Sequence, residues 1–307
     1  ASRRVGIISE DVIRRMRLEA LTERRMRDRQ FTQLHGEVDT ERSARQALER
    51  LQRLADAELV LAEVVHGSLV PSDFQHDDLA VVIRQIPCTH VGGDYIQASL
   101  PRPDLLYVCM GDVAGHGVTA ALVVSRIHGL VQRLILRETH PASFLASIDR
   151  TLLKLFESTS LFMTFAVFRI DLSAREIEYA TAGHPPQLLL RSGRQVQELR
   201  TPSRPVGLEL GTPSPEYQVG RTTYAPGDTL LLFTDGLFEV VQSGKGHEMW
   251  GEEKLKSLFV RLGRSAPEVV AETILAEVST YRGAHPSEDD VSMVVARLGN
   301  PNSPGEE

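Results

Sequence analysis

From Pro71 onward, short apolar segments alternate with turns, and this alternation limits the possible folds more than any other feature of the chain. Some segments are rich in β-branched or aromatic residues and predict strands, whereas longer ones have the period of an amphipathic helix. Several strands follow one another directly, which indicates antiparallel sheet with helices packed on it, an α+β fold. The predicted strands are 79–86, 105–113, 161–172, 176–183, 187–192, 229–236 and 291–298, and the predicted helices are 117–136, 141–156, 252–262 and 266–281.

The N-terminal part has a different pattern. Apolar residues recur at alternating steps of four and three, as in the a/d seam of a coiled coil. We therefore expect 1–70 to be a helical linker or coiled coil that forms a homodimer, 71–298 to be the folded domain, and 299–307 to be a flexible tail. Packing of the seam on the chain's own domain remains the alternative. Residues 22–43 are charge-rich and interrupted by Gly36, which predicts a less stable helix there. The seam consists of Ala44, Leu48, Leu51, Ala55, Ala62, Val65 and Leu69, with Glu58 as a break.

Composition excludes some classes of function. The net charge of −7 argues against a nucleic-acid partner, and acids are interleaved with the arginines between Arg14 and Arg29. Cys88 and Cys109 lie in apolar, strand-like contexts, so we expect reduced core residues and a cytoplasmic protein. No apolar run approaches the ~18 residues that span a bilayer, and no signal peptide is evident. The sequence begins at Ala1 without a Met, which leaves room for upstream domains.

Acids stand at the ends of predicted strands, next to small residues. Asp94 follows two glycines, Asp112 precedes Val113-Ala-Gly, Asp235 precedes a glycine, and Asp289 and Asp290 precede VSMVVARL. Any one of these acids is more often a turn former or a helix cap. Two other acids have that simpler interpretation, Asp171 in a hairpin turn and Asp228 in PGD.

Taken together, the acids at strand ends predict a metal site. A buried carboxylate is costly unless it is compensated, and several at one sheet edge would repel one another unless cations lay between them. Oxygen ligands without a His or Cys cluster select Mg²⁺ or Mn²⁺. Two such ions about 4 Å apart would activate a water molecule and bind a phosphoryl oxygen. The pattern therefore indicates metal-assisted phosphate hydrolysis.

Five motifs follow one another along the chain: GGDY (92–95), GDVAGHGVTAAL (111–122), YATAGHPPQLLL (179–190), PGDTLLLFTDGLFE (226–239) and EDDVSMVVARL (288–298). In this order they resemble the SpoIIE/RsbU-type branch of the metal-dependent PPM protein phosphatases. The resemblance covers about 71–298, and the helix that ends in AEVVHGSLVP is similar to the segment that commonly precedes this domain.

The resemblance implies an α-β-β-α sandwich of two antiparallel sheets flanked by helices, with two Mn²⁺ or Mg²⁺ ions at one end. It also implies hydrolysis of phosphoserine or phosphothreonine by a metal-activated water. By position, Asp112 would bridge the ions and the carbonyl group of Val113 would ligate one of them. Asp235 and Asp289 would complete one shell, and Asp94 would ligate the other ion. Pattern alone leaves Asp290 as an alternative to Asp289, which the alignment of DDVS favours.

The chain departs from the family pattern in two places. The first motif commonly continues as GGDYYD, but here Ile96 and Gln97 stand in the last two positions, so an acid supporting the ligands is missing and weaker metal affinity is expected. Ala114 replaces the histidine that is a proposed general acid in the wider superfamily. We expect His116 to serve the loop structure rather than donate a proton, and His184 to be a hydrogen-bonded structural residue rather than a ligand.

The resemblance further implies a bacterial partner-switching phosphatase whose substrate is a phosphorylated STAS-type anti-sigma-factor antagonist. An upstream sensor domain or regulator would act through the N-terminal helix, whose pairing would set the position of helix 118–136 and of the Asp112 loop. Two alternatives remain: a catalytically silent phosphatase fold used as a binding module, and an enzyme for small phosphate esters. No GxxxxGK[ST] or GxGxxG loop supports nucleotide binding.

Overall fold

A computed structural model describes residues 10–77, 79–115, 117–156, 161–191, 194–208, 216–242 and 248–299. The chain divides into two compact units, Ala1–Leu59 and Val60–Glu307. His116 and residues 300–307 lie outside the described part, so the expectations for that loop histidine and for the tail are not addressed by the structure.

Helix α1 runs without interruption from Glu10 to Gly67. The charge-rich segment 22–43, with Gly36, is part of this helix, as expected of a helical linker, and its lower stability stays a prediction. A single glycine in a helix costs only about 1 kcal/mol relative to alanine, which the helix-forming residues around it can offset. Leu48, Leu51 and Val65 of the predicted seam are exposed on this helix.

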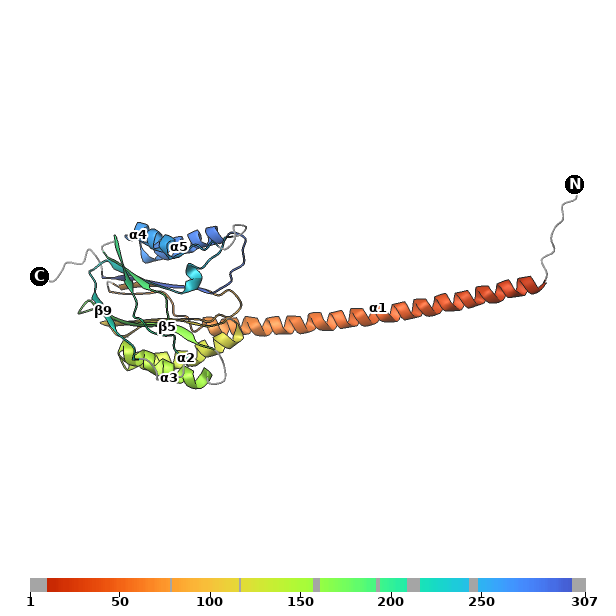
Figure 1. The fold of residues 1–307 in the computed structure, drawn as a ribbon, viewed down its shortest axis with the longest axis horizontal. Helices are drawn as coiled ribbons and strands as arrows, with labels where there is room; N and C mark the ends of the chain where they lie inside the picture. The colour runs from red at the N-terminus through yellow and green to blue at the C-terminus, as the bar shows by residue number, and fades with distance from the viewer. Residues whose placement is uncertain are drawn as a thin grey trace. The chain divides into compact units, whose positions relative to one another are not determined.

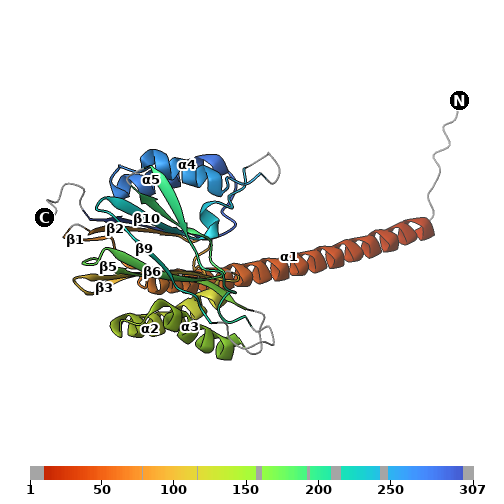
Figure 2. The same ribbon diagram turned by 60° about the vertical axis from the view of Figure 1, so that its left-hand side comes forward.

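Two antiparallel sheets form the centre of the second unit, and they lie face to face in Figure 2. The six-stranded sheet has the order β1 (Phe74–His76), β2 (Leu79–Ile86), β11 (Val291–Leu298), β10 (Asp228–Phe233), β7 (Gln187–Arg191), β8 (Gln195–Leu199). The five-stranded sheet has the order β3 (Asp94–Arg102), β4 (Leu105–Val113), β5 (Met163–Asp171), β6 (Glu176–Ala182), β9 (Gly220–Thr223).

Helices cover the outer face of each sheet (Figure 1). Helices α2 (Val118–Leu136) and α3 (Pro141–Phe156) pack on the five-stranded sheet. Helices α4 (Glu252–Leu262) and α5 (Pro267–Arg282) pack on the six-stranded sheet, and a short 3₁₀ helix, η1 (Asp235–Leu237), follows β10. The expected α-β-β-α sandwich is confirmed.

Strand alternation divides the buried side chains among three core layers. On β4, Tyr107 and Cys109 pack with the α2 and α3 layer, whereas Val108 and Met110 belong to the core between the two sheets. A third cluster lies between the six-stranded sheet and helices α4 and α5. Odd-numbered residues of β4 therefore face helices α2 and α3, and even-numbered ones face the other sheet.

Two expectations about apolar segments need correction. Cys109 is buried in β4 as expected, but Cys88 is only half buried and lies in the loop after β2, because Pro87 follows the strand's last residue. In the part of the chain that the structure describes, one helix, α2, is long and apolar enough by length and composition to cross a membrane. Its apolar side chains are nevertheless partly explained by their packing in the core beneath the five-stranded sheet.

Candidate metal centre

Asp94 and Asp112 are paired across two neighbouring strands. Asp94 is the first residue of β3, and its Cα faces that of Asp112 in the antiparallel β3–β4 ladder. Ile96 and Met110, two positions along each strand, belong to the core between the sheets, so both carboxyl groups lie on that inner face. Asp94 is only 2% exposed. Like charges directly opposite each other destabilise a sheet unless something neutralises them.

The six-stranded sheet contributes at the same place through Thr234. This residue follows β10, and its Oγ1 donates a hydrogen bond of 2.8 Å to Oδ2 of Asp94. The next residue, Asp235, begins η1 and accepts a bond from the backbone N–H of Gly236 at 3.1 Å. The hydroxyl of Thr234 thus links Asp94 to the turn that carries Asp235.

Asp290 has a different environment from its neighbour Asp289. The buried Asp290 carboxylate accepts hydrogen bonds from the backbone N–H groups of Cys88, at 2.8 Å, and Gly93, at 2.7 Å. A side chain at Gly92 would collide with this carboxylate, so the loop needs glycine there. Asp289 is exposed and accepts a bond from the N–H of Asp290 at 2.8 Å. Asp290 therefore holds the loop before β3, and Asp289 is the acid of the pair with access to solvent.

The carbonyl group of Val113 also lies close to this loop. A Cβ built on Gly93 would be 3.1 Å from the Val113 carbonyl oxygen and 2.9 Å from that of Gly115. The backbone N–H of Val113 donates to the carbonyl of Gly93 at 3.2 Å. Glycine at position 93 thus allows two carbonyl oxygens to approach the start of β3 closely.

The acids share an electrostatic environment. Burial and, next, the charge of Asp112 raise the pKa of Asp94 well above its usual range. Burial raises the pKa of Asp112 to about 8, with contributions from Asp235, Asp289 and Asp290. Burial also raises the pKa of Asp235. Burial is the main cause of each shift, and repulsion between the carboxyl groups adds to it at Asp94 and Asp112, so a bound cation would favour the charged forms of these acids.

The donor set fits Mg²⁺ or Mn²⁺, because it consists of carboxylate and carbonyl oxygens. Among the described residues, however, no three Asp, Glu, His or Cys side chains are grouped as a closed metal shell. Mg²⁺ usually keeps several water ligands and binds through one or two carboxylates. An open, partly hydrated site is therefore the arrangement that these residues fit.

The other residues considered in the sequence analysis, His184, Gln97, Asp171 and Asp228, have surroundings that indicate structural roles. The Nδ1 atom of His184 lies 2.8 Å from Oγ1 of Thr164, and burial lowers the pKa of this histidine to about 3. Gln97 is buried on the face of β3 opposite to Asp94, since the two positions differ by three. Asp171 and Asp228 accept backbone bonds from Ala174 and Ala225, as expected of turn residues.

Sequence reasoning missed the roles of Thr234 and Asp290. A threonine between an apolar strand and Asp235 was the available signal for the first. Nothing in the adjacent pair of acids showed which one would bind the backbone.

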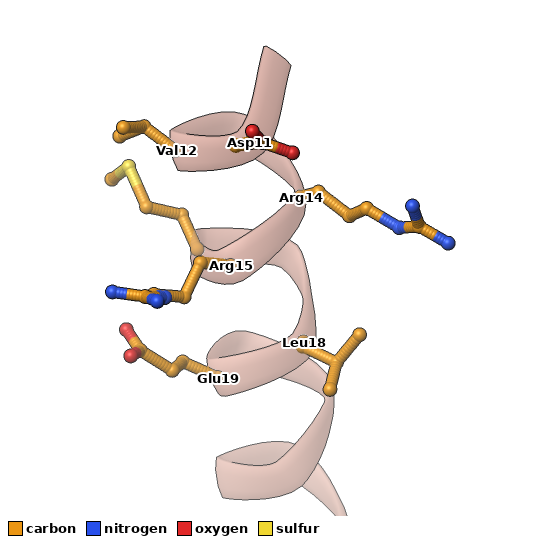
Figure 3. Close-up of a pocket in the computed structure, with 7 residues that line it drawn as sticks. Asp11, Val12, Arg14, Arg15, Leu18 and Glu19 are labelled. Atoms are coloured by element: carbon orange, nitrogen blue, oxygen red, sulfur yellow. The ribbon is translucent and has the colours of Figure 1, made fainter. Parts of the chain in front are cut away.

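A hollow near the N-terminus is not a comparable site. It is formed by side chains of a single helix, α1, which point outward from the helix and do not enclose a cavity (Figure 3). All its residues are exposed and lie in the first unit.

The family model of stage II sporulation protein E, SpoIIE, matches residues 102–299. The chain belongs to the SpoIIE family. Among SpoIIE-related curated proteins, phosphoserine phosphatase RsbP of Bacillus subtilis is 28% identical over 192 residues, which cover 61% of this chain and 46% of RsbP. Phosphoserine phosphatase RsbU of the same organism is 25% identical over 197 residues, covering 63% of this chain and 57% of RsbU. The chain thus spans about half the length of these relatives.

Solved structures share the fold of this chain. The SiaA-PP2C domain of Pseudomonas aeruginosa superimposes with a TM-score of 0.70 at 23% identity, covering 80% of this chain and 98% of that domain. The RsbU and RsbW domains of Rv1364c from Mycobacterium tuberculosis give a TM-score of 0.65 at 26% identity, covering 76% of this chain and 64% of that one. The fold is therefore PP2C-like.

Proposed function

We propose that this SpoIIE-family chain is a metal-dependent protein serine/threonine phosphatase. The observation that carries the proposal is the facing pair Asp94 and Asp112, whose pKa values are raised by burial and by neighbouring carboxylates. Two sheets contribute acids to this locus, and a phosphatase that uses cations needs such a concentration of negative charge. The names of RsbP and RsbU, both phosphoserine phosphatases, support the same activity.

The residues proposed to hold two Mn²⁺ or Mg²⁺ ions are Asp94, Asp112, Asp235, Asp289 and the Val113 carbonyl group. The exposure of Asp289, together with the backbone bonds that occupy Asp290, supports Asp289 as the ligand. Bound ions would lower the pKa of a water molecule and neutralise charge on the phosphoryl group. A solved structure of RsbX in complex with magnesium, which has this fold at 16% identity, is consistent with that choice of metal.

The proposed substrate is a phosphorylated STAS-type anti-sigma-factor antagonist in a bacterial partner-switching pathway. Its support is the relation to RsbP and RsbU, at 28% and 25% identity. The proposed regulator is an upstream domain or protein that acts on α1.

The test is hydrolysis of phosphoserine STAS proteins by the full chain, with Mn²⁺ and after chelation. We expect turnover only with the metal. Including p-nitrophenyl phosphate separates the alternative of a small-ester enzyme, which would prefer it over every phosphoprotein.

A catalytically weak or silent phosphatase fold is the second candidate. The lack of a closed three-acid shell among the described residues favours it. Binding of a phosphorylated STAS protein without phosphate release at saturating Mn²⁺ would decide for this candidate.

A further inference from the structure

A cavity of about 290 Å³ adjoins the candidate metal centre. Three segments form it: the residues after Asp235, Met249, and the loop from the end of α5 to β11. It shares Gly236 and Asp289 with the acid cluster, so a molecule held at the metals would extend into it. The lining residues are Gly236, Glu239, Val240, Val241, Met249, Arg282, His285, Pro286, Ser287, Glu288 and Asp289.

Arg282 is the cationic side chain of this cavity that has no ion-pair partner among the described residues. It is the last residue of α5 and is half buried. Its Nε atom is buried and has no hydrogen-bond acceptor among the described residues, where it also forms no ion pair. His285 is engaged differently: Nδ1 donates to the carbonyl of Pro286 at 3.0 Å, and Nε2 lies 3.9 Å from Glu288. Because the side chain is only half buried and forms no ion pair among the described residues, its guanidinium charge is available to an acceptor from outside the chain.

The rest of the cavity suggests what supplies that acceptor. Burial, and then the charges of Asp235 and Asp289, raise the pKa of Glu239, so the field here is negative. An anionic group can enter only where a cation receives it, and guanidinium binds carboxylate and phosphoryl oxygens in bidentate geometry. Val240, Val241 and Met249 offer apolar surface beside it, which suits a peptide side chain.

We propose that Arg282 is a substrate-binding residue that pairs with an oxyanion of the phosphoprotein, while the apolar wall contacts a residue next to the phosphoserine. The proposal rests on the proposed phosphatase function. The oxyanion has two sources, the phosphoryl group itself and a carboxylate that flanks it in the peptide.

The experiment compares steady-state kinetics of the full chain and Arg282→Gln at saturating Mn²⁺. Three substrates are used: p-nitrophenyl phosphate, a phosphoserine peptide with flanking glutamates, and the same peptide with glutamines. We expect Arg282→Gln to raise KM for the glutamate peptide by about 10-fold or more, the size of a lost charged hydrogen bond, with kcat and the Mn²⁺ activation midpoint nearly unchanged. A raised KM for all three substrates would show that Arg282 pairs with the phosphoryl group. A raised KM for the glutamate peptide alone would show that it pairs with the flanking carboxylate.

Arg261→Gln is the matched control, because Arg261 is an exposed arginine of α4 whose ion pair with Glu277 spans 3.4 Å. Equal KM values for Arg282→Gln and Arg261→Gln on every substrate would overturn the proposal while leaving the phosphatase function intact. No turnover of any substrate by the unmodified chain would instead remove the proposed function, and this inference with it. If the glutamine variant does not fold, Arg282→Lys is measured in its place. Lysine keeps the positive charge but cannot form the bidentate hydrogen bonds of a guanidinium group, so the KM of this variant should lie above that of the unmodified chain.

Discussion

At the scale of single residues, the charge of Asp112 is the feature on which the proposed chemistry depends. Burial raises the pKa of its carboxyl group to about 8, and the charges of Asp235, Asp289 and Asp290 add to this shift. Asp112→Asn should lower Mn²⁺-dependent kcat/KM by more than about 100-fold, since a proposed bridging ligand is lost. Asp171→Asn, at a turn acid bonded to Ala174, is the control and should retain full activity. Equal activity of the two variants would contradict the role of Asp112.

The same residue predicts a pH dependence of stability in the metal-free protein. Asp112 has a folded-state pKa of about 8, against 3.8 as the ordinary value, so the folded state keeps a proton that the unfolded state releases. Its contribution to the free energy of unfolding therefore falls as pH rises from about 4 to about 8. Calorimetric Tm values at pH 5, 6, 7 and 8 should decline less steeply in Asp112→Asn than in the unmodified chain. If Tm falls equally steeply with pH in both proteins, the pKa of Asp112 is not raised in the folded state.

Individual residues were predictable to different degrees. Strand-end position made Asp94, Asp112, Asp235 and the Asp289–Asp290 pair candidates, but it did not separate them from the turn acids Asp171 and Asp228, and their role as ligands stays a prediction. Strand position could not show that Asp290 rather than Asp289 binds the backbone. That difference depends on the backbone N–H groups of Cys88 and Gly93, about 200 positions earlier in the chain.

At the scale of elements, the loop between β2 and β3 positions the start of β3. It is anchored by the Asp290 carboxylate, which occupies the space that a side chain at Gly92 would need. Gly92→Ala should therefore displace Asp290 and reduce both Mn²⁺ affinity and Tm. Gly129→Ala is the control in α2, where an added Cβ meets nothing within 4 Å, and it should stabilise the helix by about 1 kcal/mol. Mn²⁺ titration and thermal unfolding check both variants, and a Gly92→Ala protein with unchanged values would refute the anchor.

The strands that sequence analysis missed are the edge strands of the two sheets. Strands β1 and β8 border the six-stranded sheet, and β3 and β9 border the five-stranded one. An edge strand pairs on one side only, so it needs less of the apolar, β-branched pattern that marks central strands and tolerates residues such as Pro101 in β3. Central strands and helices were recognisable because both depend on continuous apolar periodicity.

At the scale of the whole molecule, the candidate centre depends on two sheets at once. Asp94 and Asp112 come from the five-stranded sheet, whereas Asp235 and Asp289 adjoin strands of the six-stranded one. Sequence patterns define each strand's faces, but the packing of one sheet on the other follows from the complete core between them. The motifs taken together could therefore predict the convergence of the acids, whereas no single segment could.

The seam on α1 leads to a prediction about oligomeric state. Leu51 is 64% exposed, and an apolar stripe of this kind is stabilised by burial against a second helix. Leu51→Glu should shift the full chain from dimer to monomer in sedimentation velocity. Gln52→Glu introduces the same charge one position off the seam and should remain dimeric. A dimer that survives Leu51→Glu, or a monomeric unmodified chain, would exclude pairing through this seam.

The central claim is that carboxylates from both sheets bind divalent cations between them, and anomalous diffraction from crystals grown with Mn²⁺ tests it most directly. We expect two manganese peaks, with Asp112 ligating both ions and the Val113 carbonyl, Asp94, Asp235 and Asp289 completing their shells. Manganese bound elsewhere, or no peak beside Asp112 at saturating Mn²⁺, would contradict the claim.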